Sequence, residues 1–404
     1  MKDGISAFSE YIEKKSFIKQ ADVNSAFPVW VAVPVRQESS FFHETLESLE
    51  KSAYSCDEKL AVVCAVNNRA SDSEAVKSDN AALFAELKFN AAKNYPHLSL
   101  FALDYFSSGR EIPENQGVGY ARKLAMDYAL VNGAEVIACM DADTSVSEDY
   151  VSSLYEFRSL IAEKKTKRLF CLLGFEHKKE GSTVQQKAAA AYENYMKLHS
   201  EKLKDCGTPY WPVALGPTLV CSAAGYVAAG GMNLRLAGED FYFLQALIKL
   251  EISAGFLRKI SEDSGGNVGE NDLVSVGRNA GANAEYLYFY EPLYLRAVVS
   301  TSARISDRVL FGTGKKIEEL CESVSGGTEP ECPVFSDECY ETIKEFIEKK
   351  NPRQEKLAGF LSKENFSSKW DLIVKNNKKD IQLERAFHIW FDGLKIIRAI
   401  HSMI

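Results

Sequence analysis

Four apolar runs, each the length of a buried strand, constrain the fold of this 404-residue chain more than any other feature. They occupy residues 30–35, 60–66, 98–103 and 136–140, and the stretches between them carry apolar residues at helical spacing, as along 118–131. Buried strands that alternate with helices of about ten or more residues are typical of βαβ units. We therefore predict an α/β fold with a mostly parallel sheet and flanking helices.

Polar residues follow three of these runs. Glu38 comes soon after the first run, Asn67 and Asn68 follow the second, and Asp141 and Asp143 follow the fourth. Because parallel strands end at the same edge of a sheet, where α/β proteins bind ligands, we expect these side chains to lie along one edge. The sequence therefore predicts a polar site at the carboxyl ends of the strands.

The charge balance limits the partners of the chain. Its 48 basic and 56 acidic side chains give a formal net charge of −8. A general nucleic-acid binder needs a basic surface, so we expect no nucleic-acid partner. An anionic ligand must then be held by local basic groups or by a metal ion.

Cysteine usage and the start of the chain predict a cytoplasmic protein. The nine cysteines form no CxxC pair, and several lie inside apolar runs, which is typical of buried free thiols. Residues 1–15 lack the apolar segment of a signal peptide. The uncharged stretch 206–234 contains several prolines and glycines, so we predict buried helix and loop there and no transmembrane span.

The second half of the chain has a different pattern. Strands are predicted at 168–175, 286–290 and 295–300, a long helix at 182–203, and a Gly/Asn-rich loop at 262–284. From about residue 315 the chain is predicted to be helical, with a linker around 325–330. The predicted parts are a helical lead-in (1–27), a main α/β domain (28–314, with halves 28–150 and 151–314) and a helical C-terminal extension (315–404).

Two acidic motifs carry candidate chemistry. Asp141 and Asp143 suit Mg²⁺ or Mn²⁺, which prefer carboxylate oxygens and keep open positions for phosphate oxygens. The alternative is an acidic turn after a strand. Glu239 and Asp240 precede the apolar helical run 241–250 and predict a general base at the mouth of a site. The alternative there is a helix N-terminus, where acids are favoured by capping and by the helix dipole.

In their order and spacing these motifs resemble those of the inverting glycosyltransferase family 2, over about residues 28–310. The motifs are Pro-Val-Arg-Gln-Glu (34–38), Asn67 to Asp72, Gly-Val-Gly-Tyr-Ala-Arg-Lys (117–123), Asp-Ala-Asp (141–143), Gly-Pro (216–217) and Gly-Glu-Asp (238–240). The resemblance implies a GT-A type Rossmann-like sheet, with a nucleotide-binding half (28–150) and an acceptor-binding half (151–314). It also implies metal-dependent, inverting transfer of a sugar from a nucleotide-diphosphate sugar to an acceptor hydroxyl.

The resemblance further implies roles for individual residues. Asp141 approaches the ribose or the metal, Asp143 ligates Mn²⁺ or Mg²⁺, and Asp240, with Glu239 beside it, deprotonates the acceptor. The nucleotide pocket is implied to contain Pro34, Glu38, Asn67, Asn68, Asp72, Arg122 and Lys123.

The chain departs from the family pattern at several points. Asn67 and Asn68 replace two acids that the family often has, so UDP and GDP donors both remain open. Lys123 replaces the asparagine of the family's Ala-Arg-Asn. No histidine lies between His199 and His388 to supply a late metal ligand. The Gln-x-x-Arg-Trp signature of processive synthases is absent, which favours transfer of a single sugar.

Several further features leave alternatives open. Arg304 and Arg308 are expected either to bind the diphosphate or to lie on the solvated surface. Residues 312–315 do not match a Walker loop, because an earlier glycine and the Ser/Thr after the lysine are missing. The acceptor, a carbohydrate or a lipid-linked molecule, is expected near the variable stretches 211–217 and 262–284.

An apolar stripe along residues 383–400 predicts a C-terminal helix that docks onto the main domain. A homodimer contact and a peripheral contact at the inner face of the membrane are the alternatives, although the mixed charges of the opposite face favour the membrane less. For the whole chain, a non-catalytic sugar-nucleotide scaffold or sensor is the alternative function. A sugar-phosphate nucleotidyltransferase ranks lower, because the Gly-rich start of that class is missing.

Overall fold

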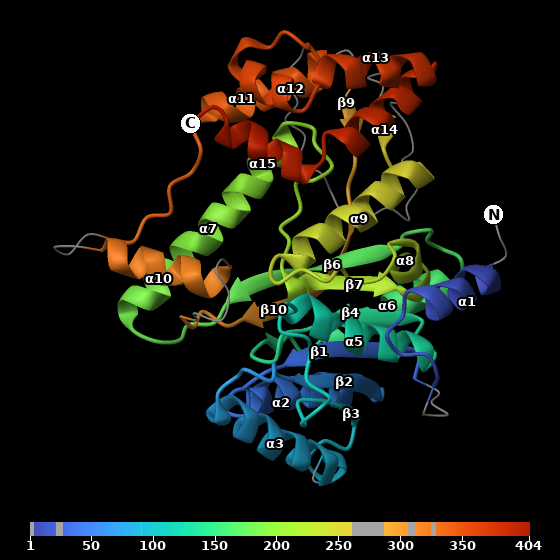
Figure 1. Ribbon diagram of the computed structural model, residues 1–404, viewed down its shortest axis with the longest axis vertical. Coiled ribbons are helices and arrows are strands. Elements are labelled where there is room, and N and C mark those ends of the chain that lie inside the picture. The colour runs from blue at the N-terminus through green and yellow to red at the C-terminus, as the bar shows by residue number, and fades with distance from the viewer. Residues whose placement is uncertain (1–3, 22–26, 90, 261–286, 306–311, 325–328) are drawn as a thin grey trace. The chain divides into compact units, whose positions relative to one another are not determined.

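The computed structural model describes residues 4–21, 27–89, 91–260, 287–305, 312–324 and 329–404 (Figure 1). It divides into two compact units. The first comprises Met1–Met196, Val213–Leu247 and Pro292–Pro333, and the second comprises Lys197–Pro212, Ile248–Glu291 and Val334–Ile404. The predicted loop 262–284 and residues 325–328 of the predicted linker lie outside the described residues.

An eight-stranded sheet forms the centre of the first unit, in the order β3-β2-β1-β4-β7-β6-β10-β5. Strands β1, β2, β3 and β4 are parallel neighbours, and β6 is parallel to β10. Strand β7 runs antiparallel between β4 and β6, and β5 runs antiparallel to β10. The bounds are β1 (Val29–Val35), β2 (Leu60–Asn67), β3 (Leu98–Tyr105), β4 (Val136–Cys139), β5 (Ser145–Val146), β6 (Phe170–His177), β7 (Leu219–Ser222) and β10 (Leu293–Thr301).

Helices cover both faces of this sheet. Valines at alternate positions of β1 pack in one core with α2 (Phe42–Cys56), α3 (Glu74–Phe89) and α6 (Tyr150–Ala162). On the other face Trp30 of β1 meets Tyr128 of α5 (Val118–Val131), with ring centroids 5.9 Å apart. A strand buried on both faces reads as a continuous apolar run, which explains the pattern at residues 30–35.

The predicted α/β class, with a flanked sheet and a helical C-terminal region, is confirmed, and the arrangement is consistent with a GT-A-like fold. One part of the prediction is corrected. The uncharged stretch 206–234, predicted to be helix and loop, contributes η1 (Gly216–Thr218), the strand β7 and α8 (Ala223–Ala228). A four-residue strand is too short to show a period of its own, and only its pairing with β4 and β6 identifies it.

The first unit contains further helices. They are α1 (Gly4–Lys14), α4 (Ala91–Asn94) and α10 (Thr313–Ser323), together with the first parts of α7 (Thr183–Asp205) and α9 (Glu239–Ala254). Within this unit, α10 packs on α7 through Ile317, Leu320, Ala188 and Ala189.

The second unit has an aromatic core, in which Phe346, Phe366, Phe387 and Phe391 are buried. The apolar stripe along residues 383–400, predicted to form one helix, lies on two helices. Helix α14 ends at Trp390, and Asp392 caps α15 by accepting the Lys395 N–H at 3.1 Å. The bounds are β8 (Arg258–Ile260), β9 (Leu287–Phe289), α11 (Asp337–Lys349), η2 (Glu355–Leu357), α12 (Ala358–Lys363), α13 (Phe366–Asn376), α14 (Asp380–Trp390) and α15 (Gly393–His401).

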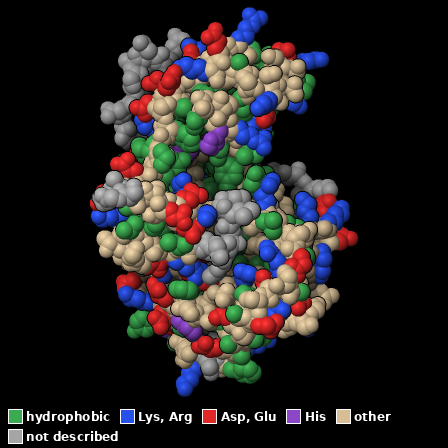
Figure 2. Space-filling view, turned by 60° about the vertical axis from the view of Figure 1, so that its left-hand side comes forward, with side chains coloured by type: hydrophobic (Ala, Val, Ile, Leu, Met, Phe, Trp, Pro, Cys, Tyr) green, Lys and Arg blue, Asp and Glu red, His purple; other side chains and the backbone are tan. Residues whose placement is uncertain are grey.

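Two surface properties bear on the expected partners. In the face shown in Figure 2, acidic and basic side chains are interspersed rather than gathered by sign. Among the described helices, none combines the length and the apolar character needed to cross a membrane.

Candidate functional site

The candidate site lies at the carboxyl edge of the sheet, within the first unit. Strands β3, β2, β1, β4, β6 and β10 all run in the same direction, so their carboxyl ends share one edge. Segments far apart in the sequence therefore end along the same edge of the sheet.

Arg304, three residues beyond the end of β10, joins two of these strand ends. Its Nη2 donates to both carboxylate oxygens of Glu38, at 2.6 and 2.8 Å, and lies 2.8 Å from Oδ2 of Asp143. The guanidinium also lies over the ring of Phe41, 4.4 Å from its centroid. The structure thus brings together Glu38, Asp143 and Arg304, whereas Arg308 lies outside the described residues.

Arg122 makes a second junction from the first turns of α5. Its buried guanidinium donates to Asp141 Oδ1 at 2.7 Å, to Glu239 Oε1 at 3.1 Å and to the Met140 carbonyl at 3.1 Å. A Cβ on Gly216 would lie 2.9 Å from Nη2 of Arg122, so a larger residue at this position would require the guanidinium to shift. One side chain therefore links the Asp141–Asp143 turn to the start of α9.

Asp240 is half-buried in the first turn of α9, and its Oδ1 accepts the N–H of Phe241 at 2.7 Å. Burial and the neighbouring charge of Glu239 raise the pKa of Asp240 to about 7, against the opposing effects of the Phe241 N–H and of Arg122. A carboxyl group with this pKa is present in both protonation states near neutral pH. That is the property of an efficient general base.

Close backbone packing sets the position of the turn before α9. A Cβ on Gly119 of α5 would lie 2.6 Å from the Asn233 carbonyl oxygen and 2.7 Å from that of Arg235. Gly238 has a φ of +70°, which favours glycine, and Asn233 Nδ2 donates to the Glu239 carbonyl at 2.7 Å. The glycine-rich start of α5 thus serves helix–loop contact.

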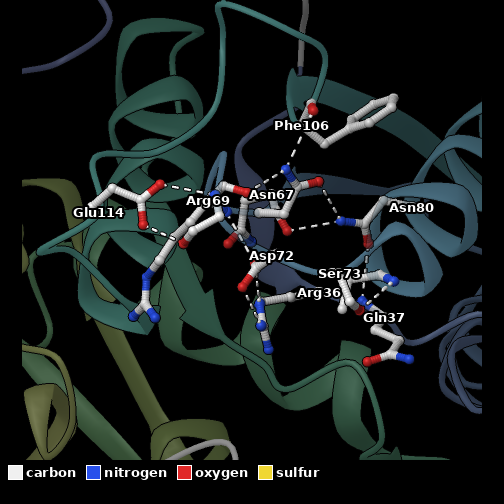
Figure 3. A network of polar contacts seen from close by, with 12 residues as sticks. Arg36, Gln37, Asn67, Arg69, Asp72, Ser73, Asn80, Phe106 and Glu114 are labelled. Atoms are coloured by element: carbon white, nitrogen blue, oxygen red, sulfur yellow. Dashed lines mark hydrogen bonds and ion pairs between the residues drawn. The ribbon is translucent and has the colours of Figure 1, made fainter.

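A buried amide network occupies the ends of β1 and β2 (Figure 3). Asn80 of α3 donates to the Asn67 carbonyl at 2.9 Å and to Asn68 Oδ1 at 3.0 Å, and accepts the Gln37 N–H at 2.9 Å. Asn67 Nδ2 donates to the carbonyls of Val35 and Ala65, both at 2.9 Å. The side chains predicted to face the nucleotide therefore also hold these two strand ends together.

Asp72 joins the same region through Arg36, with two hydrogen bonds of 2.8 and 3.0 Å, and it accepts the Arg69 N–H at 3.0 Å (Figure 3). Partial burial raises the pKa of Asp72, but these donors outweigh it and lower the pKa overall. Asp72 is thus held as a carboxylate. Pro34, half-buried in β1, pairs in register with Ala65 of β2.

Lys123 is not brought together with the other predicted residues. Its ammonium lies 2.7 Å from the Tyr11 hydroxyl and 2.9 Å from Oδ2 of Asp127, which also accepts the Phe17 N–H. The rings of Tyr11, Phe17 and Tyr226 surround the ammonium at 5.0–6.0 Å. Lys123 therefore ties the N-terminal helix to α5.

A divalent cation suits the donor chemistry of this edge. Glu38 and Asp143 supply carboxylate oxygens to one positive nitrogen of Arg304, which is an arrangement of hard oxygen donors around a cation. In the part of the chain that is described, no three His, Cys, Asp or Glu side chains are grouped as a metal site. Mg²⁺ and Mn²⁺ usually take further ligands from substrate phosphates and water, so a site with few protein ligands fits them.

Some residues of the edge were not identified from the sequence. Asn80 lies within a helical stretch, and nothing in the local sequence distinguishes it from a surface residue. His177, the last residue of β6, has its Nδ1 3.0 Å from Glu193 Oε2, and its buried Nε2 has no partner among the described residues. The contact between Glu38 and Arg304 spans 266 positions of sequence, for which the sequence carries no local signal.

Comparisons with known proteins give only distant similarities. No protein-family model and no curated protein matches the chain. The S. aureus TarS 1–349 structure in complex with UDP-GlcNAc is 14% identical with a TM-score of 0.37, over 93% of this chain and 88% of that chain. The TarS 1–349 structure without that ligand is 18% identical with a TM-score of 0.33, over 55% of this chain and 56% of that chain.

A third TarS structure is 15% identical with a TM-score of 0.31, and the match covers 34% of that chain. In two of these three comparisons the match spans less than two thirds of TarS.

Proposed function

We propose that this chain is a metal-dependent inverting glycosyltransferase that moves a single sugar from a UDP- or GDP-linked donor to an acceptor hydroxyl. The observation that carries the proposal is the bridge made by Arg122. It bonds Asp141 on one side and Glu239 on the other, so a candidate donor site and a candidate base lie next to the same guanidinium.

In this proposal the nucleotide lies along the ends of β1, β2 and β4. Pro34, Asn67, Asn68 and Asp72 line the base side of the pocket, and Asp141 approaches the ribose. Asp72 is held as a carboxylate by Arg36, so it acts only as a hydrogen-bond acceptor. Arg304, and Arg308 if it reaches the site, pair with phosphate oxygens, for which a guanidinium is well suited.

Mn²⁺ or Mg²⁺ would be held by Asp143, with Asp141 and Glu38 near it. When bound, the cation neutralises the charge that develops on the diphosphate leaving group. Arg304 is held by Glu38 and Asp143, and it carries the positive charge between these two acids.

Asp240 takes the proton of the acceptor hydroxyl in the chemical step. The hydroxyl oxygen then attacks the anomeric carbon as the bond from that carbon to the diphosphate oxygen breaks. A single in-line displacement inverts the anomeric centre. A positioned base of this kind typically contributes about 10²–10⁴-fold to the rate.

Carbohydrates and lipid-linked sugars are the acceptor classes that this proposal includes. A cytoplasmic location, with contact at the inner face of the membrane when the acceptor is lipid-linked, belongs to the same proposal. The proposal also includes a homodimer, which a measurement of the oligomeric state in solution tests.

The test is a thermal-shift series with UDP, GDP and CMP, each with and without Mn²⁺, on the wild type and on Asp143→Ala. A ligand at about 100 times its dissociation constant stabilises by about 2.7 kcal/mol, enough for a shift of a few degrees. We expect a shift with one nucleoside diphosphate that needs Mn²⁺ and is lost in Asp143→Ala. Asp371→Ala, which removes an exposed carboxylate of α13, is the matched control and should keep the shift.

Donor hydrolysis and transfer are then measured with the sugar nucleotides of the base that binds. Asp240→Asn should lose transfer and keep nucleotide binding. If no nucleotide shifts the wild type in the presence of Mn²⁺, the enzyme proposal fails. If the nucleotide binds but no sugar nucleotide is turned over, the scaffold or sensor alternative replaces it.

A further inference from the structure

Among the described residues, only the Arg122 side chain forms hydrogen bonds with both acidic motifs, through Asp141 and Glu239. At the start of α9 it bonds Glu239 and not Asp240. We propose that Arg122 is a positioning residue that engages Glu239 and thereby leaves Asp240 as the base of the reaction. This inference rests on the proposed function, because it assigns roles within the same site.

The two acids differ in what surrounds them. Glu239 is buried and receives the Nε–H of Arg122, and Arg122 is itself fixed by Asp141 and the Met140 carbonyl. The backbone of Glu239 is held as well, because its carbonyl accepts from Asn233. A carboxylate held in this way has neither the exposure nor the freedom to reach an acceptor hydroxyl.

Asp240 is the more accessible of the two acids. Its carboxylate accepts a hydrogen bond from the backbone N–H of Phe241. That bond involves Oδ1 and a main-chain donor, and among the described residues no cation forms an ion pair with this carboxylate. Because a base must be within hydrogen-bond reach of its proton and must not be neutralised by an ion pair, Asp240 meets the requirement and Glu239 does not.

The charges around Asp240 explain why Arg122 affects its chemistry. Glu239 on α9 and Asp141 after β4 make the surroundings negative, and Arg122 on α5 offsets them in part. The charge of Asp240 in turn raises the pKa of Tyr192 of α7 and of Cys139 of β4, in addition to the larger effect of burial. Removing the charge of Glu239 therefore eases ionisation of Asp240, and removing the charge of Arg122 opposes it.

The experiment follows Asp240 by thermal unfolding, without any substrate. A carboxyl group whose pKa is raised in the folded protein binds its proton more tightly there than in the unfolded chain, so its ionisation destabilises the fold. The difference in Tm between Asp240→Asn and the wild type should therefore widen as the pH rises from about 4 to about 7. The slope of this difference against pH falls to half its maximum at the folded-state pKa of Asp240, and that pH is taken as the midpoint.

The same difference is measured in the background of three further variants. With Glu239→Gln the midpoint should fall by about one pH unit or more, and with Arg122→Gln it should rise by a similar amount. Arg122→Lys, which keeps the charge, should leave the midpoint near that of the wild type. Arg158→Gln, which breaks an Arg–carboxylate pair with Glu135 away from the site, is the matched control and should not move it.

A transfer assay then separates the two acids. Glu239→Gln should retain measurable transfer with the acid limb of its pH profile displaced to lower pH, whereas Asp240→Asn should lose transfer. Loss of transfer in Glu239→Gln with activity in Asp240→Asn would reverse the assignment. Equal midpoints in Arg122→Gln and Arg122→Lys would show that the charge of Arg122 does not control the ionisation of Asp240.

If Arg122→Gln does not fold, Arg122→Lys tests the role of Arg122, because it should keep the midpoint of the wild type and retain transfer, and a shifted midpoint with lost transfer would overturn the proposal. If the protein transfers no sugar at all, the proposed function fails, while the unfolding series still shows whether Arg122 and Glu239 control Asp240.

Discussion

Three basic side chains of the first unit each meet a partner of opposite sign, which for Arg122 and Arg304 comes from a different element and for Lys123 from the same helix, α5. Arg122 meets Asp141 and Glu239, Arg304 meets Glu38 and Asp143, and Lys123 meets Asp127. Arg122 and Lys123 are consecutive residues of α5, yet their side chains have different roles. One lies at the strand edge and the other holds the N-terminal helix.

Asp127 provides the first prediction. It is fully buried and accepts from Lys123, from the hydroxyls of Tyr11 and Tyr226, and from the Phe17 N–H. Asp127→Asn leaves the Lys123 ammonium buried without its counter-charge, so the free energy of unfolding should fall by about 3–5 kcal/mol. Urea unfolding measures this loss.

Lys123→Met completes a double-mutant cycle with Asp127→Asn. Because the two charges depend on each other, the double variant should lose less free energy of unfolding than the two single variants lose together. Nucleotide affinity should remain within about twofold of the wild type in Lys123→Met, since the side chain lies in the contact with α1 and not at the strand edge. A large loss of nucleotide affinity in a folded Lys123→Met variant would show that this lysine belongs to the nucleotide site.

At the scale of elements, close packing of α5 against the loop before α9 sets where the candidate base lies. The sequence Gly117-Val-Gly119 resembles the start of a dinucleotide-binding turn, but the third glycine of that motif is missing. The structure shows another use for these glycines, since the backbone of residues 233–236 packs directly against them.

Gly119→Ala tests this contact. The added methyl group would lie within 2.7 Å of two carbonyl oxygens, so the loop must shift. We expect a destabilisation of about 1–3 kcal/mol and a loss of transfer that exceeds the loss of nucleotide binding. Gly359→Ala in α12 is the control, because a Cβ there meets nothing within 4 Å and alanine favours a helix by about 0.5–1 kcal/mol.

At the scale of the whole molecule, the two units differ in how they hold their ionisable groups. In the second unit His388 is buried beside Lys350, and burial, reinforced by that positive charge, lowers the pKa of His388 to about 3. Burial also lowers the pKa of His199 to about 4. Both histidines are therefore neutral in the folded unit at pH values where the unfolded chain takes up protons.

Acidification should consequently unfold the second unit first. The folded form binds these protons more weakly, so stability falls as the pH drops below about 6.5 and continues to fall towards pH 3. For the fully buried His388 the cost is about 1.4 kcal/mol per pH unit, or about 2 kcal/mol at pH 5. Hydrogen exchange of residues 334–404 between pH 7 and pH 4 measures it.

His388→Phe should flatten this pH dependence, and substitution of the exposed His401 with glutamine is the control that should not. Exchange that increases first in the sheet of the first unit, or a pH dependence unchanged by His388→Phe, would contradict the prediction.

Much of the fold and part of the site were predictable from the sequence, because their signals are local. The apolar runs of β1, β2 and β4 identify buried parallel strands, and the polar residues after them indicate the edge where a site forms. The acids at 141, 143, 239 and 240 are visible as motifs for the same reason. A residue type at a strand end or a helix start carries its own chemistry wherever the chain folds.

What the tertiary structure alone decided is which of these residues meet. The bond from Arg304 to Glu38, the bond from Arg122 to Glu239 and the contact of Lys123 with Tyr11 each span more than a hundred residues. The insertion of β7 between β4 and β6 depends on pairing partners in the same way. Long-range contacts follow from how whole elements pack, and neither the spacing nor the type of neighbouring residues records that packing.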